Sequence, residues 1–103
     1  MSSNESSLDC ALHAIADPTR RRILKALKEG EAEAKSQKAE TGPCLCAGDI
    51  EERVRLSQPT ISHHMAILTK AGLVEANKKG QWRWYRRNEK AIRVMVKTLR
   101  GSL

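Results

Sequence analysis

The sequence contains no phenylalanine and only two tryptophans and one tyrosine in 103 residues. Its core must therefore be built from Leu, Ile, Val, Ala and Met. A chain of this length supports one modest core and leaves little room for a cleft between two lobes. We therefore expect residues 1–103 to form a single domain. Because such a core is only marginally stable alone, we expect its spare apolar helix faces to meet in a homodimer.

Long apolar runs are also missing, since no stretch approaches the ~18 residues that a membrane span requires. The polar start, MSSNESS, has neither the basic end nor the apolar centre of a signal peptide. We therefore expect a cytoplasmic chain without a membrane partner. The chain has three cysteines, an odd number, and the cytoplasm is reducing, so a disulfide framework is not expected. The remaining roles for these cysteines are metal binding, redox chemistry or no chemical role.

Catalytic motifs are a further absence. The sequence has no ordered Ser/His/Asp set, no Gly-rich phosphate loop and no paired-carboxylate motif. We therefore expect that the protein is not an enzyme.

Positive charge is abundant, but only in one half of the chain. Residues 1–50 carry seven Lys/Arg against eight Asp/Glu, whereas residues 51–103 carry twelve against four. A basic half on a small domain is typical of proteins that neutralise phosphates, although solubility alone can also produce a net charge of +7. Composition thus favours a nucleic-acid partner.

Two helices are expected before residue 31, because apolar residues recur at helical spacing on both sides of Asp17-Pro18. Asp17 suits the cap of the second helix, Pro18 suits its first turn, and Gly30 suits its end. Residues 31–43 contain no large apolar side chain. We expect them to form a solvated insert or loop, or to prolong the helix by a turn or two without an anchor to the core.

A helix-turn-helix is expected next. Asp49 and Glu52 are placed as cap and third residue of a short third helix, and Ser57 suits the cap of a fourth. The fourth helix should end at Ala71-Gly72 and should turn one apolar face inward, formed by Ile61, Met65 and Leu68.

A hairpin and a final helix complete the pattern. The stretches LVEAN and QWRWYRR predict two strands around the turn KKG, and we expect their tryptophans to pack the hairpin onto the helices. The last fifteen residues predict a helix whose apolar stripe is Ile92, Met95, Val96 and Leu99. The predicted fold is mainly α with a small β-hairpin, a winged helix-turn-helix.

Such a fold predicts duplex DNA as the partner, because the first turns of a reading helix carry short hydrogen-bonding side chains. The residues of the fourth helix that meet this demand are Gln58, Thr60, Ser62, His63 and His64. Lys78, Lys79 and Arg83 of the hairpin are placed to contact flanking phosphates. The alternatives are an ordinary amphipathic helix beside a solvated charged face, and a protein–protein module on the same fold.

Three stretches resemble one protein family, the ArsR/SmtB family of bacterial winged-helix repressors: ADPTRRRILKAL, LSQPTISHHMAIL and KAGLVEANKKGQWRWYRR. The resemblance implies a homodimer joined through the first and last helices. It also implies a palindromic operator that the dimer leaves when an inducer binds. Carried over by position, the reading-helix residues are Ser57, Gln58, Thr60, Ser62 and His63, and the wing residues are Lys78, Lys79, Gln81 and Arg83.

Cysteine is the candidate inducer ligand, because soft thiolates select arsenite, Cd(II), Pb(II) or Zn(II). Cys44 and Cys46 share one side if their segment is extended. The resemblance places Cys46 at a ligand position at the start of the third helix, although the family's second cysteine falls here at Gly48. Cys10 is the candidate third ligand, within one subunit or across the dimer, and His13 a fourth. A thiol redox or persulfide switch, or no small-molecule inducer, remains the alternative.

Overall fold

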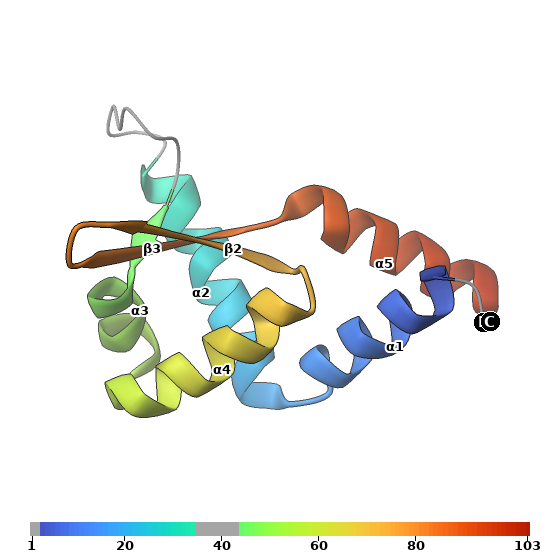
Figure 1. The fold of residues 1–103 in the computed structure, drawn as a ribbon, viewed down its shortest axis with the longest axis horizontal. Helices are drawn as coiled ribbons and strands as arrows, with labels where there is room; N and C mark the ends of the chain where they lie inside the picture. Colours follow the sequence, from blue (N-terminus) through green and yellow to red (C-terminus); the bar gives the residue numbers. More distant parts are fainter. Residues whose placement is uncertain (1–2, 35–43) are drawn as a thin grey trace.

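The computed structural model describes residues 3–34 and 44–103. In chain order its elements are α1 (Ser3–Ile15), α2 (Pro18–Ala34), β1 (Leu45–Cys46), α3 (Ala47–Val54), α4 (Gln58–Lys70), β2 (Val74–Lys79), β3 (Trp82–Arg87) and α5 (Glu89–Ser102). Helices α3 and α4 form the predicted helix-turn-helix, and the β2–β3 hairpin forms the wing. In Figure 1, α1 and α5 lie side by side at one end of the molecule and the wing extends toward the other. In these two ranges no helix has the length and apolar character that crossing a bilayer requires.

The break between α1 and α2 is confirmed. Pro18 is the first residue of α2, where the N–H that it lacks would have had no partner. One carboxylate oxygen of Asp17, Oδ1, accepts hydrogen bonds from the backbone N of Thr19 at 2.7 Å and of Arg20 at 3.3 Å. Asp17 therefore caps α2, as the sequence predicts.

Helix α2 continues to Ala34, so the prediction that it ends at Gly30 is wrong, and the alternative that the following residues prolong it by about a turn is confirmed. Gly30 is buried, and a Cβ atom there would overlap the side chain of Leu45 in β1. The glycine thus leaves room for a neighbour rather than ending the helix.

Glu31 anchors the end of α2, contrary to the expectation for residues 31–43. It is only 9% exposed, and its Oε1 accepts a hydrogen bond from the backbone N of Arg87 at 2.7 Å. The polar side chain of Glu31 thus attaches the end of α2 to the rest of the domain, a role for which an apolar side chain is expected from the sequence. Residues 35–43 of the expected loop lie outside the described residues.

Helix α3 begins earlier than predicted, because its N-cap is Cys46 and not Asp49. Asp49 is the third residue of the helix. Its Oδ2 accepts hydrogen bonds from the backbone N of Cys46 at 3.3 Å and from the Cys46 thiol at 3.1 Å. A capping box is therefore present, but its acidic residue is Asp49 and not Glu52.

The sheet has three antiparallel strands in the order β1-β3-β2, one more than the sequence predicts. Strand β1 pairs Leu45 with Tyr85 and Cys46 with Trp84. The hairpin turn has Gly80 at its first central position with φ 59°, the left-handed conformation that a two-residue hairpin turn requires. Leu45 and Tyr85 are both buried, and this pair attaches the wing to the core.

The core lies between α2, α3, α4 and the inner face of the sheet. Its largest fully buried side chains are Ile23, Leu27, Ile50, Ile61, Met65, Leu68, Leu73 and Val74. Helix α5 contributes no fully buried residue. The apolar stripe predicted for this helix does not pack as one surface. Ile92 and Met95 pack partly against the core, whereas Val96, like Val94, is 55% exposed.

Candidate DNA-binding surface

Helix α4 turns opposite faces to the core and to solvent. Ile61, Met65 and Leu68 are buried, as predicted. The N-cap and the first two turns expose Ser57, Gln58, Ser62 and His63, whereas Thr60 is half-buried. The Thr60 hydroxyl lies 2.9 Å from that of Ser57, so these two side chains hold each other at the start of the helix. The polar positions expected to read bases are therefore exposed, with Thr60 as a support.

His64 differs from its predicted role, because it is half-buried and its Nδ1 lies 3.3 Å from Nη1 of Arg20. A guanidinium only donates hydrogen bonds, so Nδ1 must accept and the ring must be neutral. Burial lowers the pKa of His64, and the charge of Arg20 lowers it further, against the opposing effect of Asp17. His64 thus fixes α4 to the rest of the domain.

Arg20 is the residue that the sequence reasoning missed. It is only 7% exposed, its Nε donates to the carbonyl of Ala14 at 2.6 Å, and its Nη2 donates to the carbonyl of His13 at 3.2 Å. These carbonyls lie in the last turn of α1, where helix geometry leaves carbonyls without the usual i+4 N–H partner. Through Arg20, the α1–α2 junction holds the side of α4 that carries His64. The sequence feature that could have indicated this role is the position of Arg20, three residues after the helix cap Asp17.

The tip of the wing carries exposed cationic side chains. Lys78 and Arg83 pair across the hairpin and are both exposed, as is Gln81 in the turn. Like charges directly opposite each other on a hairpin destabilise it unless an anion lies nearby. The backbone of Lys79 belongs to β2, but its side chain lies outside the described part of the structure. The wing tip therefore has the charge arrangement that a phosphate backbone would relieve.

The tryptophans do not both pack as predicted. Trp82 is 58% exposed near the wing tip, whereas Trp84 is half-buried. The strand alternates, so the aromatic residue that reaches the core is Tyr85. The prediction that tryptophan fixes the wing to the helices is wrong for Trp82.

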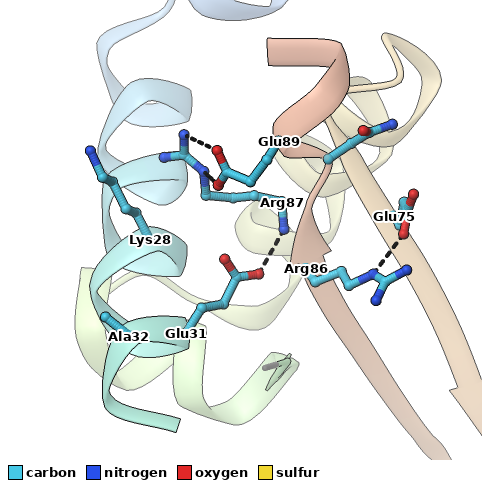
Figure 2. Close-up of a pocket in the computed structure, with 8 residues that line it drawn as sticks. Lys28, Glu31, Ala32, Glu75, Arg86, Arg87 and Glu89 are labelled. Atoms are coloured by element: carbon cyan, nitrogen blue, oxygen red, sulfur yellow. Dashed lines mark hydrogen bonds and ion pairs between the residues drawn. The ribbon is translucent and has the colours of Figure 1, made fainter. Parts of the chain in front are cut away.

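Arginines at the base of the wing are already neutralised. Arg86 Nε lies 2.6 Å from Glu75 Oε2, and Arg87 Nε lies 2.7 Å from Glu89 Oε1. Figure 2 shows both pairs around a cavity of about 540 Å³ between α2, the wing and the start of α5. Burial raises the pKa of Glu31, which lines the same cavity. These ion pairs join three elements, and the cations available to DNA are those nearer the tip.

Cys46 is the second residue of the two-residue strand β1, and Cys44 immediately precedes that strand. The two cysteines flank Leu45, whose side chain enters the core, so strand alternation turns the Cys46 side chain away from the core. Both residues are half-buried, and burial raises the pKa of both thiols. The Cys46 thiol donates to Asp49, and its strand partner is Trp84. Two of the three candidate thiols are thus neighbours.

Cys10 is separated from this pair within one chain. It is exposed on α1, which makes no contact with β1 in the described residues and lies at the other end of the molecule in Figure 1. Within residues 3–34 and 44–103 no three His, Cys, Asp or Glu residues are grouped as a metal site would require. A single chain therefore supplies two thiols, and a third from Cys10 across a dimer remains a prediction.

Comparisons with known proteins agree with this geometry. A family model described as a helix-turn-helix domain matches residues 15–76. The transcriptional repressor SdpR of Bacillus subtilis is 41% identical over 75 residues, 73% of this chain and 69% of SdpR. The arsenical resistance operon repressor of Staphylococcus aureus is 34% identical over 92 residues, 89% of this chain and 76% of that protein. The homodimeric winged helix-turn-helix DNA-binding domain of Mb0332 from Mycobacterium bovis superimposes with a TM-score of 0.68 at 20% identity, covering 99% of this chain and 87% of that one.

Proposed function

We propose that this chain, which belongs to the ArsR/SmtB family of winged-helix transcriptional regulators, acts as a homodimeric repressor that binds a palindromic DNA operator. Members of this family are DNA-binding regulators and not enzymes. The observation that carries the proposal is the position of two exposed surfaces. The polar start of α4 and the cationic tip of the wing lie at the same end of the molecule.

In this proposal α4 reads bases and the wing holds the backbone. Gln58 is the first residue of α4 and is exposed, and its amide suits bidentate recognition of adenine. Ser62 and His63 follow on the same exposed surface. Lys78 and Arg83 lack acidic partners in the described part of the chain, so they are free to contact phosphates on either side of the groove.

The dimer interface is proposed to be the α1/α5 end. Helices α1 and α5 pack together and leave Val94 and Val96 each 55% exposed on α5. An apolar crevice of about 300 Å³ between these helices continues that surface and includes Val94 and Met95. The homodimeric Mb0332 domain has the same fold. Two chains joined at this end would present two copies of α4 to successive major grooves.

The proposed inducer is a soft metal ion or metalloid bound by Cys44, Cys46 and Cys10 of the partner subunit. Three thiolates suit arsenite or Pb(II), and His13 would add a fourth ligand for Zn(II) or Cd(II). Support comes from the positions of Cys44 and Cys46 on either side of the buried Leu45, and from relatives that are named arsenical resistance repressors. Because β1 is paired to β3, ligation would change the wing strand directly.

Fluorescence anisotropy with two labelled duplexes tests the DNA-binding proposal. One duplex carries the promoter region of the protein's own gene, and the other is a scrambled sequence of equal composition. We expect the reduced protein to bind the first at least ~10³-fold more tightly at physiological salt. Equal affinity for the two duplexes would contradict sequence-specific repression.

A titration of the bound complex tests the inducer. Arsenite, Cd(II), Pb(II), Zn(II) and an oxidant are added separately to the unmodified protein, to Cys46→Ser and to Thr69→Ser, a control at an exposed position near the end of α4. We expect Cys46→Ser to bind DNA normally and to resist release, whereas Thr69→Ser responds at the usual inducer concentration. Release by oxidant alone would favour a redox switch. Identical release of Cys46→Ser and unmodified protein by a metal would exclude Cys46 as a ligand.

A further inference from the structure

Arg55 has an unusual backbone conformation in the turn between α3 and α4. Its φ is 56° and its ψ is 47°, and in the described ranges it is the only residue other than glycine with a positive φ. The backbone N of Arg55 donates to the carbonyl of Glu51 at 2.8 Å and closes the last turn of α3. Glycine ordinarily occupies such a C-terminal cap, because a Cβ atom is strained in the left-handed region.

The side chain of Arg55 does not compensate for this strain by bonding to the protein. It is exposed, and no ion pair or side-chain hydrogen bond joins its guanidinium to another of the described residues. Nearby arginines differ in this respect, since Arg53 pairs with Glu33 and Arg22 donates to the carbonyl of Val54 at 3.1 Å. Arg55 therefore leaves the helix-turn-helix with an unneutralised cation at a position where glycine would fold better.

The turn lies beside the reading end of α4. Arg55 is two residues before the Ser57 N-cap and three before Gln58, which is exposed. In Figure 1 this turn and the wing tip lie at the same end of the molecule. A strained residue that persists without a structural partner is a candidate functional residue. A planar guanidinium at the edge of a reading helix suits bidentate contact with a phosphate.

We infer that Arg55 is a DNA-phosphate contact that holds the reading helix at the groove, retained at the expense of folding stability. The inference rests on the proposed DNA-binding function. It predicts effects of opposite sign for one substitution: Arg55→Gly relieves the backbone and removes the contact. If Arg55 served only the fold, Arg55→Gly would lower both the stability of the protein and its affinity for DNA. If Arg55 had no role, Arg55→Gly would change the stability alone.

Thermal unfolding and anisotropy on Arg55→Gly, Arg55→Lys and Arg53→Gln test this inference. We expect Arg55→Gly to unfold about 2–6 °C higher than the unmodified protein. We also expect it to bind operator and scrambled duplexes about tenfold more weakly, because a charge-assisted contact is lost. The slope of log K against log[salt] should become shallower by about 0.9 for each chain that contacts DNA.

Two matched variants complete the design. Arg55→Lys keeps a cation and should keep most of the salt slope, whereas Arg53→Gln removes a cation that is already paired and should change the slope by much less. Equal DNA binding by Arg55→Gly and unmodified protein would overturn the phosphate contact. A lower unfolding temperature for Arg55→Gly would overturn the strain argument. If the unmodified protein binds no duplex, the proposed function itself fails and the inference falls with it.

Discussion

Replacing Arg20 by Ala should destabilise the fold more than any change to an exposed arginine. The guanidinium of Arg20 is buried and bonds the carbonyls of His13 and Ala14 and the Nδ1 of His64. Hydrogen bonds from a charged donor are worth about 1.5–3 kcal/mol each, and water entering the vacated space would recover part of that free energy. We therefore expect a loss of about 3–5 kcal/mol from a total stability of about 5–15 kcal/mol.

Urea unfolding followed by circular dichroism measures this loss, with Arg21→Ala as the matched control. Arg21 Nη1 also donates to a helix-end carbonyl, that of Ile15 at 2.6 Å, but Arg21 is exposed. Water can replace an exposed donor, so we expect Arg21→Ala to cost less than ~0.5 kcal/mol. Equal losses for the two variants would refute the claim that burial of Arg20 joins α1 to α4.

The same contact should make stability depend on pH through His64. The pKa of His64 is lowered in the folded protein, chiefly by burial, so the neutral ring is favoured there. Its contribution is complete above the ordinary histidine pKa of about 6.5 and is lost as pH falls through the lower folded value. Asn at this position offers an oxygen acceptor that does not titrate. We expect the unmodified protein to lose stability relative to His64→Asn between pH 7.5 and 5, and a difference that stays constant would contradict this account.

Three further predictions concern other contacts. Gln58→Ala should weaken operator binding by about 1–3 kcal/mol more than binding to scrambled DNA, whereas Lys78→Ala should weaken both alike; equal losses of specificity would mean that helix and wing are interchanged. The overlap of a Cβ at Gly30 with Leu45 costs about 1–3 kcal/mol, and the higher helix propensity of Ala offsets about 1 kcal/mol of that, so Gly30→Ala should lower the free energy of unfolding by up to about 2 kcal/mol; a gain of stability in urea would contradict that packing. Glu31→Gln should still accept the hydrogen bond from the Arg87 backbone N. Because burial raises the pKa of Glu31, the unmodified protein should lose stability as pH rises through that pKa, whereas Glu31→Gln should not. Identical profiles of stability against pH for the two proteins would contradict this expectation.

Local patterns sufficed to predict most of the fold. Asp17-Pro18 separates α1 from α2, because caps and prolines act within a few residues. Ser57 is the N-cap residue of α4 as predicted, although its hydroxyl contacts that of Thr60 and caps no backbone N–H. Gly80 supplies the left-handed turn position as predicted, but β2 runs to Lys79, so the turn consists of Gly80 and Gln81 and not of the predicted Lys78-Lys79-Gly80. These features depend on neighbours in the chain, so the sequence displays them directly.

Features that depend on distant residues were missed or misplaced. Strand β1 has only two residues, too few for a period, and forms because β3 supplies its partner. Gly30 marks the approach of Leu45 and not a helix end, and Arg20 meets His64 across 44 positions of the chain. For the candidate site, the exposure of Gln58 followed from helical periodicity, and Lys78 is exposed although it lies in β2 and not in the predicted turn. The half-burial of His64 and the separation of Cys10 from β1 required the fold.

The salt dependence of operator binding is the most direct test of the central claim that α4 and the wing of a dimer hold duplex DNA. Each chain offers three wing cations, Lys78, Lys79 and Arg83, and Arg55 in the turn before α4. If both chains of a dimer place these four residues on phosphates, the slope of log K against log[salt] should be about −7. Binding should also saturate at two chains per duplex. A slope shallower than about −2, or saturation by a single chain, would contradict the account.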